Sequence, residues 1–264
     1  MKKILLFLIC VTASTQFVSA QDNDEYELKG NEKFGYIIDK SGKKINGLVK
    51  LAGDDNHPWQ NQKKVKFVAE SDIDKSRKRQ KFKVLDDDDI QEYVAYDGDV
   101  ERKFQTIRYT NVKEGISSNM GTISAGVKAF NNLTKTNQLV ELVNDGKLKI
   151  YKIYGYPTTI AAGNRQVQLM DEEITRLKNN PTYIYSKNGS KLKDLNYDDI
   201  RSLINDCPFV KDKLSKGEYA SLKADEGKKR TGLGKLIKDQ YSNSVHDIRS
   251  TVAEVISDYN NNCN

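Results

Sequence analysis

The chain has 264 residues, of which 37% are hydrophobic and 30% are charged, and its formal net charge is +6. This length is enough for one or two domains with a buried core, and the ordered apolar runs exclude a wholly disordered chain. A charge this small for the size argues against a dedicated nucleic-acid-binding protein, which concentrates basic residues on one face.

Residues 1–20, MKKILLFLICVTASTQFVSA, have the features of a secretory signal peptide. Lys2 and Lys3 precede a short apolar stretch, and small residues end the segment at Ala20. The stretch is shorter than the roughly 20 apolar residues that span a membrane. We therefore expect cleavage after Ala20 and export to the periplasm or the cell surface. The mature chain would have no transmembrane span, and its charge would be +4 because two lysines leave with the leader.

Residues 26–112 are expected to form a small antiparallel β-domain, with a barrel-like closure as one option. Short runs rich in β-branched and aromatic residues follow one another, with polar turns and little helix between them. These runs are GYIIDKSGKKINGLVKL (35–51, a hairpin turning at Ser41-Gly42), VKFVAE (65–70), KFKVL (81–85), IQEYVAY (90–96) and KFQTIRYT (103–110).

Residues 113–136 are rich in Gly, Ser, Asn and Thr and are expected to be a linker or a long loop. A second set of strands follows, with one hairpin over 138–155 that turns at Asn144-Asp145-Gly146 and another over 181–195. Between these hairpins, the pattern of 170–179 fits both a short helix and a strand with a polar face. The second part, 137–264, is thus a sheet with helices, and the whole chain is of the α+β class.

The C-terminal residues favour helices. Asn196 is a suitable N-cap for a helix that Pro208 would end, and a second helix is expected over 210–222. From about 233 to 259, apolar residues recur every three or four positions, which indicates one amphipathic helix. We expect its apolar stripe to cover the second sheet; the alternative is that it docks on another protein.

Four short motifs stand out along the chain. They are the hairpin from Gly35-Tyr36-Ile37 to Ile45-Asn46-Gly47, Asp89-Ile90 ahead of Tyr93, Asp145-Gly146 ahead of Tyr151, and Asp206-Cys207-Pro208. In these motifs the chain resembles an uncharacterised family of exported proteins from Bacteroidota-type bacteria. The resemblance implies a location in the cell envelope and a two-part layout, and it implies no activity.

Two cysteines, Cys207 and Cys263, remain after the leader. In an oxidising compartment they could form a disulfide. The alternative is that Cys207 is a small buried apolar residue and that Cys263 is free in the tail.

No catalytic motif is present: the chain lacks HExxH, GxSxG and Cys-x-x-Cys, and its two histidines, His57 and His246, stand apart in sequence. The acidic run 86–89 does not fit the spacing of a calcium loop. We therefore predict no catalytic residues, no metal and no cofactor. Acids near aromatic residues could still pair to cleave glycosides, and the candidates are Glu92, Asp97, Asp99 and Glu101.

The candidate binding residues lie in the first part of the chain. The densest basic run, KSRKRQKFK (75–83), contains Arg77, Lys78 and Arg79 and could contact an acidic glycan or a lipid phosphate. Its lysines could equally protect an edge strand from unwanted pairing. Trp59, in a polar segment, is predicted to be an exposed contact, and the other candidates are Tyr93 and Tyr96.

These observations favour a non-enzymatic exported module that binds an envelope protein or polymer, with no nucleic acid among its partners. One alternative is an envelope hydrolase that uses Asp/Glu chemistry. The other is a structural component of an envelope assembly, joined to it through the terminal helix.

Overall fold

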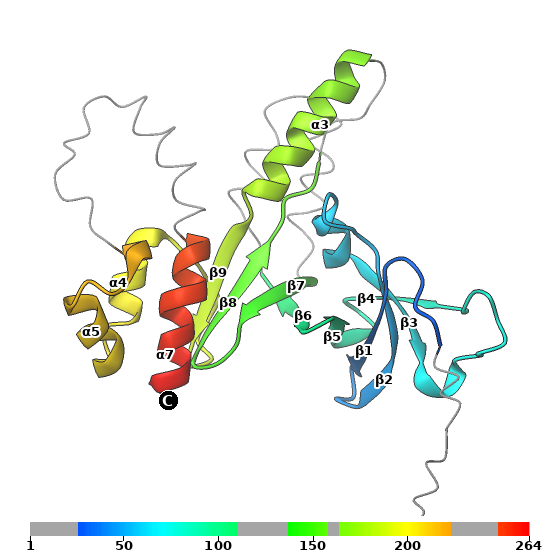
Figure 1. Ribbon diagram of the computed structural model, residues 1–264, viewed down its shortest axis with the longest axis horizontal. Coiled ribbons are helices and arrows are strands. Elements are labelled where there is room, and N and C mark those ends of the chain that lie inside the picture. The colour runs from blue at the N-terminus through cyan, green and yellow to red at the C-terminus, as the bar shows by residue number, and fades with distance from the viewer. Residues whose placement is uncertain (1–25, 110–136, 158–163, 223–247, 264) are drawn as a thin grey trace, which may run out of the picture.

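The computed structural model describes residues 26–109, 137–157, 164–222 and 248–263 (Figure 1). Its centre is one antiparallel sheet of ten strands in the order β10-β9-β8-β7-β6-β5-β1-β2-β3-β4, and a few helices accompany it. The α+β class is confirmed. The strands are β1 (Glu32–Asp39), β2 (Lys44–Leu51), β3 (Lys64–Ala69), β4 (Lys83–Asp86), β5 (Ile90–Asp97), β6 (Val100–Arg108), β7 (Asn137–Asn144), β8 (Leu148–Ile153), β9 (Thr182–Lys187) and β10 (Lys193–Asp194).

The N-terminal half of the sheet is strongly curled. Only residues 87–89 link β4 to β5, although β3, β2 and β1 lie between those two strands in the sheet. Such a link spans at most about 14 Å, whereas strands about 4.8 Å apart would separate β4 from β5 by roughly 19 Å in a flat sheet. The sheet nevertheless stays open, with β4 and β10 as its edges. The barrel-like option was therefore wrong, because β4 and β5 share no ladder of backbone hydrogen bonds.

A pair of glycines lies at the centre of this curl. Gly35 of β1 is directly opposite Gly47 of β2. A Cβ atom on Gly35 would lie 2.0 Å from the carbonyl oxygen of Val94, and one on Gly47 would lie 2.1 Å from that of Val68. The neighbouring backbones thus approach too closely for any side chain, as is typical of a tight bend within a sheet.

Strands from both predicted parts of the chain belong to this one sheet. β6 pairs with β7 from Lys103–Leu142 to Arg108–Asn137, so the ladder is continuous between them. The predicted division into domains at residues 113–136 stays a prediction, because those residues lie outside the described part of the chain.

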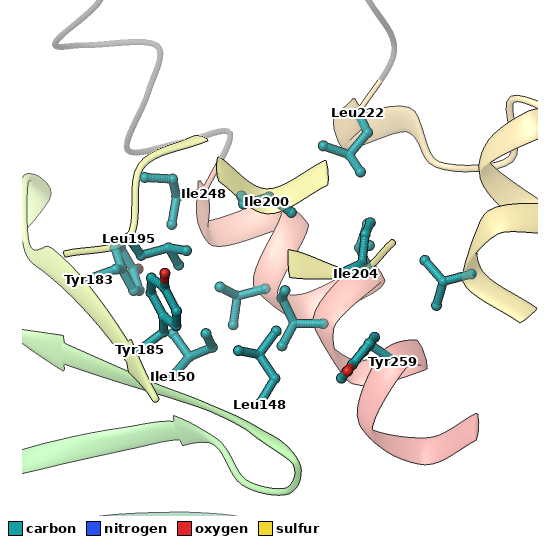
Figure 2. Packing of buried hydrophobic residues seen from close by; sticks show 14 of the residues in the cluster. Leu148, Ile150, Tyr183, Tyr185, Leu195, Ile200, Ile204, Leu222, Ile248 and Tyr259 are labelled. Atoms are coloured by element: carbon teal, nitrogen blue, oxygen red, sulfur yellow. The ribbon is translucent and has the colours of Figure 1, made fainter. Parts of the chain in front are cut away.

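Side-chain alternation along the strands produces separate hydrophobic clusters. Inside the curl, one cluster is built around residues such as Phe67, Tyr93 and Phe104. A second cluster lies between β8–β9 and the C-terminal helices (Figure 2). A third cluster lies on the other face of β8 and β9 and includes Tyr151 and Ile184.

The α-helices of the described residues are α3 (Asn164–Asn179), α4 (Ile200–Leu203), α5 (Pro208–Ser215) and α7 (Ser257–Asn262). Residues 170–179 belong to α3, so the helix was the correct one of the two alternatives for this segment.

Pro208 does not end a helix but begins α5, where its missing N–H costs nothing. Asn196 caps only the short 3-10 helix η3 (Tyr197–Asp199), and no side-chain cap hydrogen bond forms there. Over 210–222 the structure has α5 and the 3-10 helix η4 (Ala220–Leu222) instead of one helix.

The described part of the terminal helix, residues 248–262, covers the sheet as predicted (Figure 2). It includes one wide π-helical turn, η5 (Val252–Ile256), and runs into α7. Its buried stripe packs against β8 and β9 and comprises Ile248, Val252, Val255, Ile256 and Tyr259. Residues 233–247, including His246, lie outside the described part.

Two further contacts fix the end of this helix. The Asn260 side chain accepts a hydrogen bond from the Leu148 N–H (2.8 Å) and donates one to the Leu148 carbonyl (2.8 Å). Gly146 allows this approach, because a Cβ there would lie 2.7 Å from the Asn260 side chain. Cys207 and Cys263 form a disulfide, with their Cα atoms 5.6 Å apart. The chain end is thus tied to the turn between β7 and β8 and to the start of α5.

Candidate functional site

A cleft of about 680 Å³ opens at one mouth of the curled sheet, and we call it the β1–β4 cleft. Its volume lies within the range of ligand pockets in proteins. The floor is apolar and includes residues from all five strands β1 to β5, among them Ile37, Ile45, Phe67, Leu85 and Ile90.

The wall of the cleft is the segment between β3 and β4, which begins with the 3-10 helix η2 (Glu70–Asp72). The buried Gln80 side chain closes this segment into a ring. It accepts a hydrogen bond from the Asp74 N–H (3.0 Å) and donates one to the Asp74 carbonyl (2.7 Å). From outside, the Lys29 ammonium donates to the Lys78 carbonyl (2.6 Å). The wall therefore has a defined shape before any ligand binds.

Four aspartates line the cleft, and two of them, Asp39 and Asp74, are engaged in local contacts. Asp74 forms an ion pair with Arg77 (2.8 Å), and its pKa is lowered mainly by the hydrogen bond from the Ser76 hydroxyl. Asp39 accepts hydrogen bonds from the Ser41 hydroxyl and from two backbone N–H groups, and the Ser41 bond is the main reason that its pKa is lowered. These carboxylates satisfy local turns, so they have little capacity left for a ligand.

The predicted basic run lies at this site. Arg77 lines the cleft, together with Lys81 and Lys83. Lys78 and Arg79 are exposed on the same segment but are not part of the lining.

The prediction that Trp59 is an exposed contact was wrong. Trp59 is 5% exposed. It lies in the 3-10 helix η1 (Pro58–Gln62), edge-on to the His57 ring at 5.4 Å. The Gln62 side chain holds η1 against the end of β8 by bonding both backbone groups of Tyr154. Trp59 therefore shares no exposed face with the 75–83 run.

The two candidate tyrosines also fail to form one surface. Tyr93 is fully buried, stacks on Phe104 at 4.5 Å between ring centroids and donates its hydroxyl to the Asn61 carbonyl. Its predicted role as a contact is therefore wrong. Tyr96 is 40% exposed, but it lies three positions after Tyr93 and therefore points to the opposite face of β5.

The candidate glycosidase acids do not converge on the cleft. Glu92 is buried and accepts hydrogen bonds from the Tyr36 hydroxyl (3.0 Å) and the Gln105 amide (2.8 Å). Asp97 forms an ion pair with Lys33. Asp99 is exposed in the turn between β5 and β6, and Glu101 is exposed in β6. None of the four acids lines the cleft.

Sequence reasoning missed a buried ionic cluster on β6, β7 and β8. Glu141 is 7% exposed. Its carboxylate lies 3.1 Å from the Arg102 Nε atom and 2.8 Å from the Lys152 Nζ atom. The contact with Lys152 is an ion pair without a well-aligned hydrogen bond. Burial alone would raise the pKa of Glu141, but the charges of Lys152 and Arg102 outweigh it and lower that pKa. Only the register of the ladder brings these residues together.

Glu141→Gln is expected to lower the free energy of unfolding by about 2 kcal/mol at neutral pH, because two buried cations lose their counter-charge. Since the folded pKa of Glu141 is below the ordinary value of 4.5, the ionic contribution is fully present above that pH and is lost as the pH falls through the folded pKa. Denaturant titrations of both proteins from pH 7 to pH 3 should therefore converge in acid. A constant difference would contradict this assignment.

Among the described residues, no group of three or more His, Cys, Asp or Glu side chains is placed to hold a metal ion. Comparisons with protein-family models, with curated proteins and with solved structures find no match to this chain. The geometry of the β1–β4 cleft therefore carries the functional argument.

Proposed function

We propose that this protein is an exported, non-enzymatic binding module and that the β1–β4 cleft binds its ligand, an envelope protein or polymer. The observation that carries the proposal is the combination of an apolar floor with a charged rim and a fixed wall. A concave apolar surface with a few placed polar groups is the usual form of a binding site.

Export is supported by the leader-like residues 1–20 and by the Cys207–Cys263 disulfide, because disulfides persist mainly in oxidising compartments. No helix in the described part of the chain is both long and apolar enough to cross a membrane.

The contacts favour binding over the two alternatives. A glycosidase or another Asp/Glu hydrolase needs a carboxylic acid with a raised pKa, whereas two of the four aspartates that line the cleft, Asp39 and Asp74, have lowered pKa values. A structural component that docks through the terminal helix needs an accessible apolar stripe, and the described part of that stripe is buried. Binding at the cleft requires neither feature.

The proposal is tested by placing a photo-crosslinking lysine analogue at Lys81, on the cleft, and in a second variant at Lys191, which is exposed in the turn between β9 and β10. After irradiation of the native cells, a discrete adduct is expected from position 81 and not from position 191. Equal labelling at both positions, or turnover of envelope glycans by the purified protein, would contradict the proposal.

A further inference from the structure

The connection between β9 and β10 contains an exposed Asn-Gly dipeptide, Asn188-Gly189. Both residues have a positive φ, 54° for Asn188 and 70° for Gly189. The Ser190 N–H donates to the Lys187 carbonyl (3.0 Å) and closes a turn around the dipeptide. These are the φ signs of a type I′ turn, in which asparagine and glycine are the favoured central residues. The dipeptide is therefore presented at the surface in a defined conformation.

The two groups that react in asparagine deamidation are accessible in this turn. The closing hydrogen bond uses the backbone of Lys187 and Ser190, and among the described residues neither the Gly189 N–H nor the Asn188 side-chain amide has a hydrogen-bond partner. Gly189 has open space around it, because a Cβ atom there would meet no heavy atom within 4 Å. The attacking nitrogen and the carbon that it attacks thus belong to adjacent exposed residues.

The other Asn-Gly dipeptide of the sequence, Asn46-Gly47, lies in a different environment. It is inside β2, which pairs with β1 on one side and with β3 on the other, so its backbone N–H groups are used in the two ladders. Gly47 is also packed tightly, because a Cβ atom there would lie 2.1 Å from the Val68 carbonyl oxygen. The Gly47 nitrogen cannot turn towards the Asn46 side chain without breaking the sheet.

We infer that Asn188 is a site of non-enzymatic covalent modification, at which the side-chain amide is converted to a carboxylate. The Gly189 nitrogen loses its proton to solvent base and forms a bond to the Asn188 Cγ atom. The bond from Cγ to the side-chain nitrogen breaks, and ammonia leaves with a proton from solvent. Water then opens the resulting five-membered succinimide at either carbonyl, which gives aspartate or isoaspartate. The inference is independent of the proposed function of the β1–β4 cleft.

The modification changes both the charge and the shape of the turn. Each product adds one negative charge at position 188, between Lys187 and Lys191 in the sequence. Isoaspartate also lengthens the main chain by one methylene group, so the hydrogen bond from Ser190 to Lys187 cannot keep its geometry. The Asn188 N–H donates to the Lys147 carbonyl (2.7 Å), so the change also affects the contact of this turn with the start of β8.

The test incubates the purified folded protein at pH 7 and at pH 9 and follows both dipeptides by peptide mapping with mass spectrometry. Deamidation at Asn188 is expected to be at least about tenfold faster than at Asn46, which corresponds to a barrier lower by about 1.4 kcal/mol. The reaction is expected to be faster at pH 9, because the attacking nitrogen must lose its proton. The isoaspartate product should accept a methyl group from an isoaspartate-specific methyltransferase.

The same incubation in urea is the structural control. Once the ladders of β2 are lost, Asn46 and Asn188 are expected to react at similar rates. Asn188→Gln is the matched variant, because a longer side chain must close a six-membered ring and reacts far more slowly. We expect Asn188→Gln to abolish most of the deamidation of the folded protein, and Asn46→Gln to leave it unchanged.

Three outcomes in the folded protein would overturn the inference. These are no deamidation at Asn188, equal rates at Asn188 and Asn46, and a faster reaction at Asn46. A rate difference of the same size in urea would also overturn it, because the folded environment would then not be its cause. The measurements on the wild type stand by themselves if a glutamine variant proves unstable in thermal unfolding.

Discussion

Replacing Cys207 and Cys263 together with alanine is expected to lower the free energy of unfolding by about 4 kcal/mol. The residues are 56 positions apart, so their bond restricts a long loop in the unfolded chain. Without the bond, the unfolded chain gains conformational entropy and is favoured over the folded state. The folded state itself keeps its other contacts at this end, including those of Asn260 with Leu148. Urea titration with and without a reducing agent measures the effect.

The double alanine variant is the control for this experiment, because its midpoint should not change when the reductant is added. If the oxidised wild type and the double variant unfolded at the same urea concentration, the disulfide would contribute nothing to stability.

Gly47→Ala is expected to lower the free energy of unfolding by about 3 kcal/mol, because the new methyl group would overlap the Val68 carbonyl oxygen and force the backbones of β2 and β3 apart. Gly35→Ala should behave in the same way against Val94. Equilibrium denaturation measures both variants.

Gly42→Ala is the matched control. Gly42 has a positive φ of 86° but open space around its Cβ position, so alanine there costs only about 1 kcal/mol of local conformational energy. Equal effects at positions 42 and 47 would show that the close backbone approach has no energetic weight.

The sequence predicts the individual strands well, because their periodicity and turn residues are local properties. The hairpin over 35–51 is one example, since Gly42 supplies the positive φ that its turn requires. The joining of β6 to β7 could not be predicted, because the pairing of Lys103 with Leu142 depends on contacts across a long stretch of chain.

At the candidate site, the sequence predicted the basic run 75–83 but not the cleft that it borders. Ile37 and Phe67 were expected to lie in strands, but only the curl of the sheet turns such residues into the floor of a cleft. Trp59 was misjudged because the polar residues around it suggest exposure, whereas Gln62 reaches across to Tyr154 and brings η1 against the sheet. Pro208 was misjudged because proline occurs both just after one helix and at the start of the next.

The arrangement of the β1–β4 cleft has a consequence for how the protein could be re-engineered. Its floor belongs to the ladder, where substitutions disturb folding, but its wall is a single surface insertion between two neighbouring strands. Insertions of this kind tolerate changes in length at small entropic cost. Exchanging residues 73–82 for another sequence should therefore reshape the wall of the cleft while the ladder beneath it stays intact.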